Sequence, residues 1–136
     1  MKLQSLGFQT TSESRANVND KGIHILGDFY DVQNGFDEML NADLLEKFCE
    51  QKVEAVGLTQ VGKLFYQFPG SGVTGVILLA ESHVAIHTWP EKGYLTLDIY
   101  VCNVSQDNTE KAKRIYQYFK EFFLPQRLNH QEVERE

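Results

Sequence analysis

The chain has 136 residues, of which 42% are hydrophobic and 12% aromatic, and this is the composition of one folded domain rather than of a disordered chain. Thirteen Lys and Arg against nineteen Asp and Glu leave a net charge of -6, so the chain lacks the cationic surface that would hold a nucleic-acid backbone. The sequence shows no apolar run of membrane-spanning length, no signal-peptide core and only two cysteines, so we expect a cytoplasmic protein with reduced thiols.

The first half of the chain predicts a strand, a helix and further strands. Residues 1–21 show neither helical nor strand periodicity and are expected to form a loose N-terminal arm, followed by a single domain over 22–136. A β-prone run covers 23–30. Apolar residues at helical spacing predict a helix over 38–51, and residues 53–68 predict one or two strands with a bulge or bend at a glycine.

The second half predicts three more strands and a helix. Residues 73–79 are almost all apolar or small, which fits a strand covered on both faces or lying at the centre of a sheet. From 83 to 102, aliphatic residues alternate with polar and aromatic ones, so the two sets should point to opposite faces of their strands. A helix capped near Asp107 carries an apolar stripe and ends at Pro125, and the charged tail over 127–136 is expected to form a short strand or none.

This order of elements predicts an α+β fold, a two-layer sandwich of a mostly antiparallel sheet with helices on one face. A chain of 136 residues is long enough for one ordinary domain but not for two, and no internal repeat of short period is visible.

Chemically reactive residue types are concentrated in the segment 80–91, which contains two His, two Glu, one Ser, one Thr and the only Trp. One interpretation treats them as ordinary structural residues. A metal site formed by His83, His87 and Cys102 has suitable ligand types but lacks the CxxC or HExxH spacing that makes such a site specific. A nucleophilic Ser82 paired with a histidine base lacks the GxSxG elbow of many hydrolases.

A longer pattern distinguishes among these interpretations. Glu81-Ser82-His83, followed by Ile86-His87-Thr88-Trp89-Pro90-Glu91 and then by Asp98 and Cys102, resembles the bacterial and archaeal S-adenosylmethionine decarboxylases that make their own pyruvoyl cofactor. The similarity is ungapped from Gly72 to Cys102, and a looser similarity covers Gly22 to Tyr30. The resemblance implies decarboxylation of S-adenosylmethionine to the aminopropyl donor for spermidine synthesis, by a homodimer with active sites near the subunit boundary.

The resemblance also gives a role to each residue of the cleavage reaction. The chain is expected to cut itself between Glu81 and Ser82, and Ser82 becomes the pyruvoyl group that condenses with the α-amine of the substrate. An uncharged serine hydroxyl is a poor nucleophile and needs strain, a base or an oxyanion stabiliser. His87 and Thr74 take part in this processing, with Thr74 at a position where most relatives have Ser.

Three further residues are assigned to the decarboxylation itself. Cys102 is the expected proton donor, Glu91 accepts hydrogen bonds from the ribose hydroxyls, and Phe68 stacks on the adenine, although Phe68 could equally be a core aromatic residue. Two positions depart from the family pattern. Gly70 replaces a proline two residues after Phe68, and Asn103 replaces the glycine that often follows the cysteine, a change expected to affect only the strand end.

Two other functions remain possible on the sequence. A relative with the same pyruvoyl chemistry could decarboxylate ornithine or arginine, but Glu91 and Phe68 favour a nucleoside. An inactive regulatory paralogue could keep the fold alone, but the retention of Ser82 and Cys102 at these spacings argues for chemistry.

Overall fold

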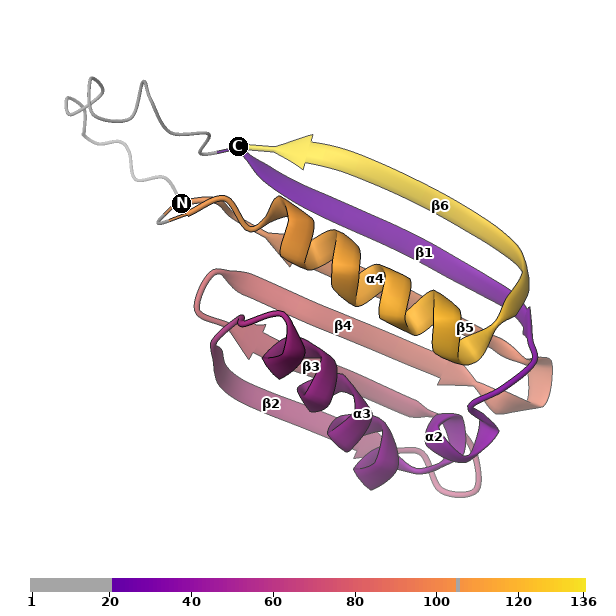
Figure 1. Cartoon of the computed structure of the whole chain (residues 1–136). Coiled ribbons are helices and arrows are strands. Elements are labelled where there is room, and N and C mark those ends of the chain that lie inside the picture. Colours follow the sequence, from indigo (N-terminus) through magenta and orange to yellow (C-terminus); the bar gives the residue numbers. More distant parts are fainter. Residues whose placement is uncertain (1–20, 105) are drawn as a thin grey trace, which may run out of the picture.

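The computed structural model describes residues 21–104 and 106–136, and in that part of the chain six strands form one antiparallel sheet (Figure 1). The strands are β1 (Gly22–Val32), β2 (Gln60–Gln67), β3 (Val73–Leu79), β4 (Ser82–Trp89), β5 (Tyr94–Val101) and β6 (Pro125–Arg135). The helices are α2 (Phe36–Leu40), α3 (Ala42–Ala55), α4 (Thr109–Phe123) and the short 3-10 helix η2 (Pro90–Lys92). The strand order β2-β3-β4-β5-β1-β6 sets the long strand β1 between β5 and β6.

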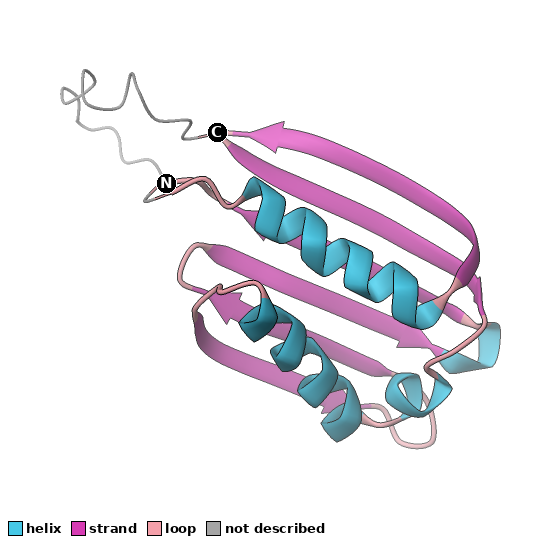
Figure 2. Ribbon diagram, in the orientation of Figure 1, coloured by secondary structure: helices cyan, strands magenta, loops and turns pink. Residues whose placement is uncertain are grey.

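All of these helices that pack on the sheet cover the same face of it, as Figure 2 shows for α3 and α4. The core lies between the two layers, where Phe119 and Phe123 of α4 and Leu45 of α3 are fully buried against the strands. The predicted α+β class, with an antiparallel sheet and helices on one face, is therefore confirmed.

In the described part of the chain, no helix lies on the opposite face of the sheet (Figure 2), and we call it the open face. On β4, Val84 and Ile86 are buried beneath the helices, while His83 and His87 lie on the open face and are half-buried. β5 alternates in the same way. The alternation predicted from the sequence is confirmed, and it places the polar and aromatic set of both strands on the open face.

Thr88 is the exception on β4, because it is a polar residue on the buried face. Its hydroxyl accepts a hydrogen bond from the Val73 backbone N–H (2.9 Å) and donates one to the Met39 carbonyl oxygen (2.8 Å). It thereby ties α2 and the start of β3 to the centre of the sheet. Gly72 lies so close to this strand that a Cβ atom there would overlap the Thr88 carbonyl oxygen, so a glycine is required.

The helix predicted over 38–51 is two helices that meet at Asn41. The Asn41 side chain accepts hydrogen bonds from the backbone N–H groups of Asp43 and Leu44, and this cap starts α3 as a new helix. α3 also continues to Ala55, beyond the predicted end of the helix at residue 51, so the first residues of the range 53–68 are helical. One strand follows, with a register shift between Gln60 and Gly62 as expected for a bulge.

The strands at and near the two edges of the sheet also differ from the prediction. The charged tail forms the eleven-residue strand β6, which pairs with β1 along its length, where the sequence predicted a short strand or none. β3 is covered on one face only, since Leu78 on the open face is 49% exposed. Of the predicted N-terminal arm, residues 1–20 lie outside the described part of the chain.

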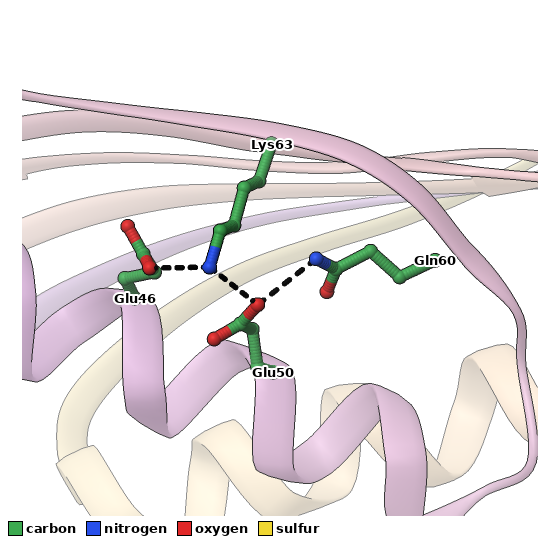
Figure 3. A network of polar contacts seen from close by, with 4 residues as sticks. All are labelled: Glu46, Glu50, Gln60 and Lys63. Atoms are coloured by element: carbon green, nitrogen blue, oxygen red, sulfur yellow. Dashed lines mark hydrogen bonds and ion pairs between the residues drawn. The ribbon is translucent and has the colours of Figure 1, made fainter.

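A polar network attaches α3 to the edge strand β2 (Figure 3). The Lys63 ammonium group donates to Glu46 (2.7 Å) and Glu50 (2.9 Å), and the Gln60 side chain donates to the same Glu50 carboxylate (2.9 Å). These hydrogen bonds lower the pKa of Glu50. The Glu50 carboxylate therefore stays charged, and the network keeps α3 in place over the outer strand.

Candidate active site

The predicted cleavage site lies in the tight turn between β3 and β4. Leu79 pairs with Ser82, so Ala80 and Glu81 are the only residues of the turn, and Ser82 is the first residue of β4. Ser82 has a φ of 127°, a conformation that residues other than glycine rarely adopt and that costs about 1–3 kcal/mol. Backbone strain is thus placed at the residue whose preceding peptide bond is predicted to break.

Cys102 lies directly beside this turn, because Ser82 pairs with Val101 at the end of β5. The backbone N–H of Cys102 donates to the Glu81 carbonyl oxygen (3.1 Å), and the Glu81 carboxylate accepts from the Asn108 side chain (2.8 Å). Burial and the negative charge of Glu81 raise the pKa of the Cys102 thiol, while backbone N–H groups act in the other direction. The thiol is therefore neutral at pH 7 and can donate a proton.

A group of aromatic and imidazole rings lies on the open face along the strands that lead to Cys102. The His24 and His83 rings are each within 6 Å of the Tyr100 ring, and the His24 ring nitrogen Nε2 lies 3.7 Å from the Asp98 carboxylate. Burial, followed by the nearby His24 and Arg135, lowers the pKa of His83, against the opposite effect of Asp98. His83 is therefore a neutral imidazole at pH 7.

The remaining predicted site residues lie at the other end of the sheet. Thr74 and His87 face each other across β3 and β4, with a hydrogen bond of 3.1 Å between the Thr74 hydroxyl and His87 Nδ1. Phe68 follows β2, is 46% exposed and contacts the Tyr66 ring edge-on with 4.9 Å between ring centres. Glu91 lies in η2 and is exposed.

The predicted site is therefore divided into two groups within one chain. Ser82 and His87 are five residues apart on the same strand, which is about 16 Å at 3.3 Å per residue. In Figure 1 the β3–β4 turn with Ser82 lies at the left end of the sheet, and the connection from β4 to β5 lies at the right. His87 of one chain cannot act on Ser82 of the same chain at this separation.

Other kinds of site find little support in the structure. Within residues 21–104 and 106–136, no three His, Cys, Asp or Glu side chains gather in a way that could hold a metal ion. A cavity of about 400 Å³ between α3 and β2 is lined by Glu50, Val53, Glu54, Leu58 and Gln60, and contains none of the predicted site residues. No helix in the described part of the chain is long and apolar enough to cross a membrane.

Asn103 and Asn108 have contacts beside the β3–β4 turn that were not predicted from the sequence. Asn103 was expected to matter only for the strand end, but it is buried and its side chain accepts from the Asn108 backbone N–H (2.7 Å). The replacement of a glycine directly after Cys102 was the available signal, because it adds a polar side chain next to the cleavage turn.

Comparison with known proteins agrees with the pattern of these residues. The sequence profile of a family described as S-adenosylmethionine decarboxylase matches residues 23–136. S-adenosylmethionine decarboxylase proenzymes from Persephonella marina and Archaeoglobus fulgidus are 39% and 37% identical over 114 residues, which is 84% of this chain and 81% and 96% of theirs. The crystal structure of the adenosylmethionine decarboxylase from Aquifex aeolicus superposes with a TM-score of 0.75 at 38% identity, covering 86% of this chain and 92% of that one.

Proposed function

The chain belongs to the S-adenosylmethionine decarboxylase family, and we propose that it becomes active by cutting its own Glu81–Ser82 bond and converting Ser82 into a pyruvoyl group. It is a carboxy-lyase that acts on S-adenosylmethionine and supplies polyamine biosynthesis. The observation that carries the proposal is the strained Ser82, whose preceding carbonyl oxygen already accepts a hydrogen bond from Cys102.

The cleavage uses atoms of this chain throughout. Ser82 Oγ attacks the Glu81 carbonyl carbon, its proton passes to the Ser82 nitrogen, and the C–N bond breaks to leave Glu81 as an ester of the Ser82 side chain. Loss of the Ser82 Cα proton then breaks the Cβ–Oγ bond and frees Glu81 as a new carboxylate chain end. Water replaces the Ser82 nitrogen, which leaves as ammonia, and a pyruvoyl group remains.

The Cys102 backbone N–H lies where negative charge develops in the first of these steps. The Glu81 carbonyl oxygen becomes an oxyanion when Ser82 Oγ attacks, and a donor 3.1 Å away stabilises it. When formed, the pyruvoyl group would supply an electron sink for the electrons released with carbon dioxide. The neutral Cys102 thiol would then return a proton to the substrate carbon.

The separation of the two residue groups favours a shared site in a homodimer. Large apolar side chains lie exposed on the open face, among them Leu64 (69% exposed), Tyr66 (54%) and Leu78 (49%), and a patch of this kind is typical of a surface covered by a partner. A second copy packed on this face about a two-fold axis perpendicular to the strands would have its strands running in the opposite direction. That arrangement brings Thr74 and His87 of the partner subunit to Ser82.

The substrate-binding residues would be shared in the same way. Phe68 and Glu91 lie at the same end of the sheet as His87, so they would reach the pyruvoyl group from the partner subunit. Phe68 offers an exposed ring for the adenine and Glu91 a carboxylate for the ribose hydroxyls.

The two free thiols also suit a reducing compartment, and the cytoplasmic location stays a prediction.

Mass spectrometry of the purified protein tests the proposal directly. We expect two fragments, residues 1–81 and 82–136, with the second lacking a free amino terminus, and a single chain in Ser82→Ala. Release of carbon dioxide is then measured with S-adenosylmethionine, ornithine and arginine side by side. An intact wild-type chain would refute the pyruvoyl group, and release from ornithine or arginine alone would refute the substrate.

A further inference from the structure

Two asparagines beside the cleavage turn are buried, although asparagine usually lies at a protein surface. Asn103 and Asn108 are each 1% exposed, and with Thr88 they are the buried polar side chains of the described residues. The contacts of Thr88 hold α2 and β3, as given above. The burial of the two asparagines needs a separate explanation, because burying a polar group destabilises the fold unless hydrogen bonds replace those to water.

Asn108 stands at the N-cap position of α4 but does not cap the helix. The side-chain oxygen of an N-cap asparagine normally accepts a hydrogen bond from an N–H of the first helical turn. Here no such bond forms, and the Asn108 Oδ1 atom is buried without a partner. The neighbouring Asp107 instead accepts from the Thr109 N–H (3.0 Å).

The Asn108 amide group donates hydrogen bonds to the turn between β3 and β4 and to the end of β5. Its Nδ2 atom donates to the Glu81 carboxylate (2.8 Å) and to the Cys102 carbonyl oxygen (3.0 Å). Both partners can only accept, so they fix which way the amide faces, and a flipped amide would set oxygen against oxygen at both contacts. One side chain thus joins the residue before the breaking bond to the residue that supplies the oxyanion donor.

Asn103 holds Asn108 in this position. The Asn103 Oδ1 atom accepts from the Asn108 backbone N–H (2.7 Å), and its Nδ2 atom donates to the Lys21 carbonyl oxygen (2.6 Å) and to the Thr109 hydroxyl (3.3 Å). Asn103 therefore joins Asn108 and Thr109 at the start of α4 to Lys21 at the start of the domain.

We propose that Asn108 is a positioning residue for the self-cleavage reaction, which holds Glu81 so that its carbonyl oxygen stays on the Cys102 N–H while Ser82 attacks. The inference rests on the proposed function, because it assigns a role within that cleavage. Without the Asn108 contact, the Glu81 side chain loses its 2.8 Å hydrogen bond to the N-cap residue of α4, and the Glu81 carbonyl oxygen is positioned less firmly on the Cys102 N–H. The carbonyl would then leave the oxyanion donor in part of the molecules, and cleavage would slow.

The experiment follows cleavage of freshly made protein over time by denaturing electrophoresis in Asn108→Asp, Glu81→Gln and the double variant. Asn108→Asp sets a carboxylate against the Glu81 carboxylate, and we expect cleavage at least about tenfold slower than in wild type, which corresponds to about 1.4 kcal/mol in the barrier. Glu81→Gln restores a donor opposite Asp at position 108. Asp at position 108 would still face the Cys102 carbonyl oxygen, so we expect partial recovery: Asn108→Asp should slow cleavage clearly less when Gln occupies position 81 than in the wild-type background.

A purely structural role would give a different result. Equal slowing by Asn108→Asp in both backgrounds, or no slowing in either, would overturn the proposal, while cleavage of the wild-type chain in the same assay keeps the proposed function standing. Asn34→Asp is the matched control, since the Asn34 amide also donates to a backbone carbonyl, that of Phe122, at the far end of the sheet. It should cleave at the wild-type rate.

Two further measurements test the proposal if a variant folds poorly, and identify which step of the cleavage reaction Asn108 affects. If Asn108→Asp lowers the melting temperature, the two single variants and the double variant are made with Asn108→Ala and Glu81→Ala instead. The double variant should then cleave no more slowly than the slower single variant. If the two effects on the cleavage rate multiply, the proposal is wrong. At neutral pH and room temperature, hydroxylamine splits an ester between residues 81 and 82 rapidly and leaves the amide whole. Slow variants should therefore stay whole in hydroxylamine, and rapid splitting would show that Asn108 acts after the ester forms, against the proposal.

Discussion

In the proposed mechanism, the Cys102 side chain and backbone have separate tasks at the turn between β3 and β4. The backbone N–H donates to the Glu81 carbonyl oxygen, whereas the thiol takes no part in that contact. The charge of Glu81, next to burial, keeps the thiol protonated. Substitutions of the side chain and of Glu81 should therefore separate self-cleavage from proton donation.

The raised pKa of Cys102 predicts how its reactivity depends on pH. In Ser82→Ala, which keeps the chain whole, alkylation by iodoacetamide should rise with pH and reach its midpoint above the usual 9.0 of a thiol, because only the thiolate reacts. Adding Glu81→Gln removes a negative charge and should move the midpoint to lower pH. Cys49 serves as the internal control, because burial raises its pKa strongly and hides it from the reagent. A midpoint that Glu81→Gln leaves in place would contradict this electrostatic account.

Cys102→Ala should cleave itself and yet fail to decarboxylate. Alanine keeps the backbone N–H that faces Glu81, so the fragments should form, while the proton donor is lost and turnover should fall by roughly 10²- to 10⁴-fold. Fragments are followed by mass spectrometry and turnover by release of carbon dioxide. Near-normal turnover in the cleaved variant would assign the proton to another group, with His83 the first to examine.

At the scale of helices and strands, periodic apolar patterns predicted the elements that have one buried face, whereas the extent of the exposed edge strand β6 was not predicted. The alternation from 83 to 102 predicted both strands and their faces, because each has one buried side. The length of β6 was underestimated because nearly all of its side chains are exposed, so its sequence carries no alternation. Its place comes from pairing with β1. The apolar spacing also continued across Asn41, which concealed the cap that separates α2 from α3.

Thr88 should matter for stability although it lies within the reactive segment. Thr88→Val keeps the shape but leaves the Val73 N–H and the Met39 carbonyl oxygen buried without their partner, which we expect to cost about 2 kcal/mol or more of the free energy of unfolding. Denaturant unfolding of the Ser82→Ala protein measures it on a uniform chain. The exposed Thr59 gives the control Thr59→Val, and equal losses from both changes would mean that the hydroxyl of Thr88 contributes nothing special.

At the scale of the whole molecule, the sequence assigned roles to residues but did not show how far apart those residues lie in the fold. A short motif places Ser82 and His87 five residues apart, and in an extended strand that spacing separates them by about 16 Å. The hydrogen bond between Thr74 and His87 depends on the pairing of β3 with β4, which no local pattern specifies. The two groups become one site only if a second chain covers the open face.

A shared site predicts that two inactive variants can restore each other. Ser82→Ala lacks the nucleophile and His87→Ala lacks the assisting imidazole, so neither should cleave when expressed alone. In a mixed dimer, Ser82 of the His87→Ala chain meets the intact His87 of the partner subunit, and that chain should then cleave. With equal expression and random pairing, about half of the His87→Ala chains should be cut, because half have a Ser82→Ala partner.

Mass spectrometry distinguishes the two kinds of chain if one of them carries a tag. Co-expression with the double variant Ser82→Ala/His87→Ala is the control, since that partner offers no imidazole and should leave the His87→Ala chain whole. If the His87→Ala chain stays uncut beside Ser82→Ala, or is cut equally beside the double variant, His87 does not act across a subunit boundary and the shared site is wrong.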